Sequence, residues 1–207
     1  AASDVYKRQV QRRWGPVPGL RKEVQHILIR QGRVIIATDG SSKGRRHRIR
    51  VAAYGMAAGN FRHGGEVDGL DQTSCMSEIW ALYKTMESIQ GLRGEIWVII
   101  DNLGVMKEAR RCQKHARKGV GIWWKIEPLI QSCPDIHFEW VPSHGKKIGK
   151  WKPPQSHEEK EWRDLNEAAD QEAEDARIVK WNREDPMRKA DQDAIRRSYG
   201  ALMRARG

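Results

Sequence analysis

The sequence predicts an α/β fold in which a five-stranded mixed sheet is flanked by helices. Residues 34–39 and 95–100 form two nearly unbroken apolar runs, which are typical of central strands buried on both faces. Three further strands are predicted from β-prone composition, at residues 49–58, 61–67 and 136–141. Four helices are predicted from apolar residues at helical spacing, at residues 74–90, 103–116, 122–130 and 162–176. This order of elements favours a mixed sheet with helices packed on it.

The chain is predicted to hold one domain with an extension at each end. The domain spans residues 33–176, and residues 1–32 are expected to form an N-terminal extension or linker. Residues 177–207 are expected to form a charged helical tail. The first residue is Ala1, and residues 3–9 resemble translated cloning adaptor, so we expect the start to be artefactual and the chain to be a fragment.

Glycine, serine and proline mark the expected breaks between elements. A turn is predicted at residues 40–48, and a loop at residues 146–160, which contain a Pro-Pro pair. Pro186 is expected to interrupt the C-terminal tail, so that a separate last helix covers residues 187–204.

The charge balance points to a polyanionic partner. Lys and Arg total 38 against 27 Asp and Glu, which gives a formal net charge of +11 and a sequence pI of about 9.8. Such a surplus suits nucleic acid first and an anionic membrane surface second. The longest apolar runs are far shorter than the ~20 residues that span a bilayer, so no membrane is expected among the partners. The three cysteines form no CxxC pair, which favours a reducing intracellular location, in the nucleus or cytoplasm.

Four carboxylates are expected to converge at one edge of the sheet. Both unbroken strands end in an aspartate, Asp39 and Asp101, and parallel neighbouring strands would bring these to the carboxyl edge, where ligands bind in open α/β sheets. Glu78 lies near the start of the first predicted helix, and Asp170 lies on one flank of the last. Converging carboxylates repel one another unless a cation neutralises them. Hard oxygen ligands select Mg²⁺ or Mn²⁺ over zinc.

Taken singly, each of these residues has a simpler interpretation. Asp39 and Asp101 are of a type common in turns after strands. Glu78 is placed to complement a helix N-terminus, and Asp170 is placed as a solvated helix carboxylate would be. Their occurrence together, in one order along the chain, is what favours a metal site.

Four short motifs carry these carboxylates, and a fifth carries His144. They are TDGS at residues 38–41, SEIWAL at 77–82, IDN at 100–102, WVPSHG at 140–145 and NEAAD at 166–170. In this order they resemble the motifs of the ribonuclease H family, the cellular type one enzymes and the retroelement domains alike, over about residues 33–176. The resemblance implies a ribonuclease H-like fold and an endonuclease that hydrolyses the RNA strand of RNA–DNA hybrids.

The resemblance also implies roles for single residues. It makes Asp39, Glu78, Asp101 and Asp170 the catalytic ligands of two Mg²⁺ ions, for which Mn²⁺ can substitute, and it makes His144 a further catalytic residue. Substrate binding is implied for residues beside these acids and on a basic helix face: Gly40, Ser41, Arg45, Thr73, Ser74, Asn102, Arg110, Arg111, Lys114 and Asn166. The implied partners are an RNA–DNA hybrid and the rest of a reverse-transcriptase polyprotein, with a stand-alone enzyme as the alternative.

The sequence departs from the family's pattern in three respects. The basic stretch at residues 107–125 is too short for the handle helix of the bacterial enzymes. The stretch between His144 and Asn166 is longer than the family's usual loop. Arg45, Ser74 and Leu103 stand where the family often has polar amides that contact the hybrid. Two alternatives therefore stay open, namely a non-catalytic module of this fold that binds nucleic acid, and a nuclease of this fold that cuts DNA.

Overall fold

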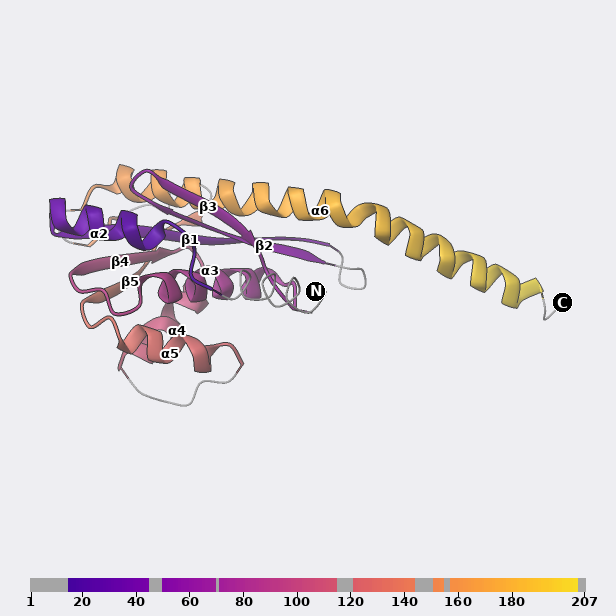
Figure 1. Cartoon of the computed structure of the whole chain (residues 1–207), viewed down its shortest axis with the longest axis horizontal. Coiled ribbons are helices and arrows are strands. Elements are labelled where there is room, and N and C mark those ends of the chain that lie inside the picture. Colours follow the sequence, from indigo (N-terminus) through magenta and orange to yellow (C-terminus); the bar gives the residue numbers. More distant parts are fainter. Residues whose placement is uncertain are drawn as a thin grey trace, which may run out of the picture.

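A computed structural model describes residues 15–44, 50–69, 71–114, 121–143, 151–154 and 157–204. Its elements, shown in Figure 1, are α2 (Leu20–Gln31), β1 (Arg33–Lys43), β2 (Val51–Ala58), β3 (Phe61–Glu66), α3 (Ser74–Ile89), β4 (Glu95–Ile100), α4 (Leu103–Lys114), α5 (Trp123–Gln131), β5 (Ile136–Trp140) and α6 (Glu159–Arg204). From β1 onwards the strands and helices follow the predicted order, and α2 precedes them.

The strands form one mixed sheet in the order β3-β2-β1-β4-β5. β1 is parallel to β4, and β4 is parallel to β5, whereas β2 is antiparallel to both β1 and β3. The predicted α/β fold with a five-stranded mixed sheet is therefore confirmed. Thr38 of β1 pairs with Ile100 of β4, so the residues that follow them, Asp39 and Asp101, lie at the same edge of the sheet.

Helices cover both faces of the sheet. In Figure 1, α6 runs along one face, where it contacts β1, β2 and β3, while α3 packs on the opposite face against β1 and β2. Residues of β1 alternate between two apolar cores. Ile36 contributes to the larger core with α3, whereas Ile35 contributes to the smaller core, which includes Trp162 and Leu165 of α6. Because neither face meets water, residues 34–37 are apolar without a break.

The helix ahead of β1 packs on the larger core. Leu20, Val24 and Ile27 recur every three or four residues along α2 and are all buried. Before the helix begins, the amide of Val17 donates a hydrogen bond to Oγ of Ser88 in α3, at 2.8 Å. The larger core therefore includes residues that precede the predicted start of the domain.

The turn predicted at residues 40–48 is wrong in its first part. β1 continues to Lys43, whose backbone pairs with Val51 of β2. Glycine and serine are weak strand formers, and the sequence gives no apolar alternation there. Antiparallel pairing with β2 nevertheless satisfies the backbone groups of this stretch, and this outweighs the low intrinsic preference.

The helix break predicted at Pro186 is also wrong, because α6 is a single helix of 46 residues. Figure 1 shows that it leaves the sheet and continues past it. A proline inside a helix costs about 3 kcal/mol, but the neighbouring positions are rich in Ala, Glu, Lys and Arg, which are strong helix formers. Ion pairs between successive turns, such as Arg177 with Glu174, add support. Neither α6 nor any other helix in the described ranges is long and apolar enough to cross a bilayer.

A missing side chain lets α6 lie very close to the sheet. Gly55 of β2 pairs with Asp39 of β1 on one side and with Gly64 of β3 on the other. A Cβ atom at Gly55 would collide with the backbone oxygen of Ala169 and lie 2.5 Å from the backbone nitrogen of Ala173. Glycine is therefore required at this position. Its lack of a side chain brings the backbone of α6 next to the cross-strand pair of Gly55 and Asp39.

Replacing Gly55 with alanine should destabilise the fold, although alanine is the better residue for an ordinary strand. The added methyl group must push α6 away from the sheet, which we expect to lower the free energy of unfolding by about 3 kcal/mol. Urea denaturation measures this. Gly104→Ala is the control, because a Cβ atom there would contact only Oδ1 of Asn102, at 3.3 Å. Equal losses in the two variants would contradict the packing argument.

Candidate active site

Three carboxylates from three different elements meet at one edge of the sheet. Oxygen atoms of Asp39, Glu78 and Asp101 all lie within 4.8 Å of one another. Asp39 lies in β1 at the level where β4 ends, and Asp101 is the first residue after β4. The predicted convergence of these three acids is thus present in the structure.

Close packing of α3 on β1 brings Glu78 to the two aspartates. Gly40 follows Asp39, and a Cβ atom at Gly40 would collide with the backbone nitrogen of Glu78 and lie 2.5 Å from Oγ of Ser77. The absence of a side chain at Gly40 lets the first turns of α3 touch the strand. Thr73 fixes the start of this helix, since its hydroxyl accepts a hydrogen bond from the Met76 amide at 3.2 Å.

Burial makes the cluster electrostatically costly. The exposed fractions of Asp39 and Glu78 are only 3% and 5%. Burial, followed by repulsion from Asp101, raises the pKa of Asp39 to about 8, although the Gly40 amide donates a hydrogen bond to Oδ1 at 2.6 Å and opposes the shift. Burial and the charge of Asp39 likewise raise the pKa of Glu78 well above its ordinary value.

The donor set fits a hard divalent cation. Among the residues that the structure describes, Oε2 of Glu78 is buried and has no hydrogen-bond partner. A buried carboxylate oxygen without a donor is expensive, and a cation bound by Glu78 and the two aspartates would satisfy it. Carboxylate oxygens favour Mg²⁺ or Mn²⁺ over softer metals.

The fourth predicted carboxylate, Asp170, lies near this group without being part of it. Its charge is one of the causes of the raised pKa of Asp39, so the two side chains are close enough to interact. Asp170 follows Ala169, whose backbone closely approaches Gly55, and Gly55 pairs with Asp39. The position of Asp170 therefore depends on the close contact between α6 and the sheet.

Several residues predicted to bind substrate have partners within the protein. Asn102 caps α4, because its Oδ1 accepts hydrogen bonds from two backbone amides of the helix, at 3.0 and 3.2 Å. Ser41 donates to Glu174 at 2.8 Å and accepts from Arg177 at 3.1 Å. Ser74 is exposed at the start of α3, whereas Asn166 is buried, and its Oδ1 meets no donor within the described part of the chain.

The basic residues of α4 differ in their freedom to contact a ligand. Arg110 donates to the backbone oxygen of Phe138 at 2.7 Å and forms an ion pair with Glu139, so it ties α4 to β5. Arg111 is paired with Glu108 on the helix surface, and Lys114 is exposed at the helix end. The remaining predicted site residues, Arg45 and His144, lie outside the described residues.

Sequence reasoning missed one residue that supports the cluster. Nε1 of Trp140, at the end of β5, donates a hydrogen bond to the backbone oxygen of Asp101 at 2.8 Å. This bond helps to fix the backbone of the loop that carries the Asp101 carboxylate. Trp140 belongs to the motif noted at residues 140–145, but nothing in the sequence links it to a residue 39 positions earlier.

The strand order and the acidic edge define a ribonuclease H-like fold. The solution structure of the PFV RNase H domain matches with a TM-score of 0.55 and 18% identity, covering 70% of this chain and 94% of that one. The foamy viral protease-reverse transcriptase in complex with dsDNA matches with a TM-score of 0.45 and 16% identity, covering 68% and 93%. No family model and no curated protein matches the sequence. The fold implied by the motifs is confirmed, and at this identity the likeness concerns the fold.

In the absence of divalent cations, raising the pH should increase the stability of an Asp39→Asn variant relative to that of the wild-type protein. The pKa of Asp39 is about 8 in the folded state, whereas an unfolded aspartate titrates near pH ~4. The folded protein therefore keeps a proton that the unfolded chain releases. The stability contributed by the neutral carboxyl is lost as the pH rises from about 4 to about 8, whereas asparagine has no such proton to lose.

Urea unfolding in EDTA at pH 5 and at pH 8 measures this difference. The stability of Asp39→Asn relative to wild type should increase between the two pH values. Asp135→Asn is the control, because Asp135 is an exposed carboxylate just before β5. A difference between Asp39→Asn and wild type that stays constant with pH would show that Asp39 does not retain the proton.

Proposed function

We propose that the chain is an endonuclease that hydrolyses the RNA strand of RNA–DNA hybrids with the help of divalent cations. The observation that carries this proposal is the group formed by Asp39, Glu78 and Asp101, with oxygens within 4.8 Å of one another. Carboxylates this close together, two of which are buried, are stable as anions only beside a cation. Their place at the carboxyl edge of a ribonuclease H-like sheet supports a nuclease site over a purely structural one.

Each element of the site has a defined task. The parallel strands β1 and β4 hold Asp39 and Asp101 side by side, α3 adds Glu78, and α6 supplies Asp170 at the flank. Two Mg²⁺ ions are the proposed cofactor, with Mn²⁺ as a substitute. Bound there, they would activate a water molecule and stabilise the leaving 3′ oxygen, which yields a product with a 5′ phosphate. His144 is proposed to assist protonation or product release.

Contact with the hybrid backbone is assigned to the basic face of α4. Arg111 and Lys114 lie on the helix that follows Asp101. Arg110 is used to tie α4 to β5, which makes it a weaker candidate. The net charge of +11 supports a polyanionic substrate. The rest of a reverse-transcriptase polyprotein is the other proposed partner, and an intracellular location is proposed.

Labelled RNA–DNA hybrid, incubated with the protein and Mg²⁺, should be cut in its RNA strand, and EDTA should stop the reaction. Asp101→Asn should abolish cleavage while the protein stays folded or becomes more stable, because one of several mutually repelling charges is removed. The exposed carboxylate variant Asp135→Asn serves as the control and should cut as wild type does.

Single-stranded RNA and double-stranded DNA are tested beside the hybrid. Cleavage of the duplex DNA in place of the hybrid would replace the proposal with a DNA nuclease of the same fold. Binding of hybrid without any cleavage would replace it with a non-catalytic module. Cleavage of the hybrid that persists in excess EDTA would contradict the role given to the cations.

Reversing the charges of Arg111 and Lys114 to Glu should raise the KM for hybrid more than it lowers kcat, because phosphate contacts act on binding. Steady-state kinetics at several salt concentrations measure this, and the loss should shrink as salt rises. The double variant Lys22→Glu, Arg30→Glu makes the same change in net charge on exposed positions of α2. If both double variants raise the KM equally, the effect comes from total charge and the assignment to α4 fails.

A further inference from the structure

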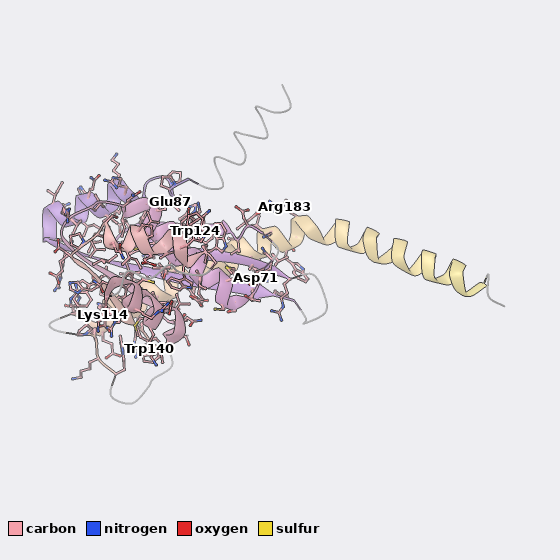
Figure 2. All side chains as sticks on the ribbon, turned by 90° about the horizontal axis from the view of Figure 1, so that it is seen from below. Asp71, Glu87, Lys114, Trp124, Trp140 and Arg183 are labelled. Carbon is pink, nitrogen blue, oxygen red and sulfur yellow. The ribbon has the colours of Figure 1, made fainter. Side chains whose placement is uncertain are left out.

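One short stretch of α6 contacts two of the segments that carry the acidic cluster. It consists of Glu174, Arg177 and Lys180, which recur every third residue and which we call the α6 clamp. Arg177 and Lys180 lie beyond the residues predicted for the last helix of the domain, yet both are buried. Figure 2 shows Asp71, which precedes Gln72 in the chain, and Arg183, which follows Lys180 on α6, near the end of the domain from which α6 projects.

Lys180 is buried among oxygen atoms of the sheet and of the loop before α3. Its exposed fraction is 7%. Nζ donates to the backbone oxygen of Val67 at 2.8 Å, to Oε1 of Gln72 at 2.9 Å and, more weakly, to the backbone oxygen of Ala52 at 3.5 Å. A buried ammonium group is costly unless its donors are used, so these contacts fix the place of the side chain.

Gln72 passes this restraint to the loop that leads into α3. Its Nε2 donates to the backbone oxygens of Val67 and Gly69, at 3.1 and 2.8 Å, and its Oε1 also accepts from the Ala52 amide at 2.9 Å. The next residue in the chain is Thr73, whose hydroxyl caps α3. Lys180 is therefore connected through Gln72 to the first turn of the helix that presents Glu78.

The same stretch of α6 also holds the strand that carries Asp39. Arg177 donates to Oγ of Ser41 at 3.1 Å, and Ser41 donates to Glu174 at 2.8 Å. Arg177 in turn forms an ion pair with Glu174. Ser41 lies two residues after Asp39 in β1, so the clamp restrains Asp39 and Glu78 from a common element.

We propose that Lys180 is a positioning residue that sets the placement of Glu78 through Gln72, and that the α6 clamp is required for the site to bind its cations. The inference rests on the proposed function for its metal-binding and kinetic readouts, whereas hydrogen exchange tests the restraint on α3 independently. Replacement of Lys180 by methionine keeps the length and apolar stem of the side chain. It also leaves the contacts of Gln72 with Ala52 and Val67 in place, so the loop should loosen without unfolding.

The test compares Lys180→Met with Lys180→Arg, which keeps a cation and several donors, and with Arg183→Met. Arg183 lies on the same helix and forms an ion pair with Glu66 of β3, so its replacement removes a cation and an ion pair close to the clamp. Three properties are measured, namely amide hydrogen exchange over residues 67–78 without metal, Mn²⁺ affinity by electron paramagnetic resonance, and kcat and KM for hybrid cleavage.

Lys180→Met should speed exchange over residues 67–78 and weaken Mn²⁺ binding by about tenfold, the lower end of the effect of groups that orient metal ligands. It should lower kcat with little change in KM. Lys180→Arg should restore most of the Mn²⁺ affinity, and Arg183→Met should resemble wild type. If Lys180→Met shows no cooperative unfolding transition, Lys180→Gln, which keeps one donor group, replaces it and the same outcomes apply.

The proposal is overturned if Lys180→Met exchanges and binds Mn²⁺ as wild type does, or if Arg183→Met loses as much affinity as Lys180→Met. Failure of the proposed function would look different. If the wild-type protein binds Mn²⁺ but leaves the hybrid intact, the nuclease assignment fails. The role of the clamp is then still tested by the Mn²⁺ affinities of the variants. Wild-type protein that binds no Mn²⁺ would remove the metal site, and hydrogen exchange would then decide whether Lys180 restrains the start of α3.

Discussion

The carboxyl groups of Asp39, Glu78 and Asp101 repel one another whenever two of them are ionised, and burial strengthens that repulsion because little water screens it. Carboxylate side chains on flexible segments would move apart to relieve this repulsion. They stay together because each is attached to a rigid element whose position is set elsewhere, by strand pairing and by helix packing. The energy for holding them comes from the two apolar cores on either side of the sheet.

Two glycines and a few hydrogen bonds determine where the helices and loops around the three acids lie. Gly40 allows α3 to touch β1, and Gly55 allows α6 to touch β2, so both helices approach the strands more closely than ordinary side chains would permit. Trp140 ties the loop after β4 to the end of β5, and Lys180 ties α6 to the loop before α3. The resulting arrangement holds the carboxylates together before any ligand binds, because their mutual repulsion has already been opposed when the protein folds.

The sequence alone allowed the sheet and the three central acids to be predicted, because these depend on local signals. The unbroken runs before Asp39 and Asp101 indicated buried neighbouring strands, and the motif around Glu78 indicated its helix. Pro186 was misleading, since a local break signal says nothing about the helix formers on both sides. The partner of Arg110 on β5 lies 28 residues away, and the acceptors of Lys180 lie over 100 residues away, so only the folded chain reveals them.

A pKa near 8 for Asp39 means that the metal-free cluster retains a proton at neutral pH. A divalent cation bound at this cluster would compete with that proton for the same oxygen atoms, so binding would release acid to the solvent. The measured heat of binding would then include the ionisation of the buffer and would differ between buffers of unlike protonation enthalpy. At a fixed concentration of a free divalent cation, a fall in pH would then lower the fraction of sites that hold a cation, so that acidity as well as cation supply would set the occupancy of the proposed site.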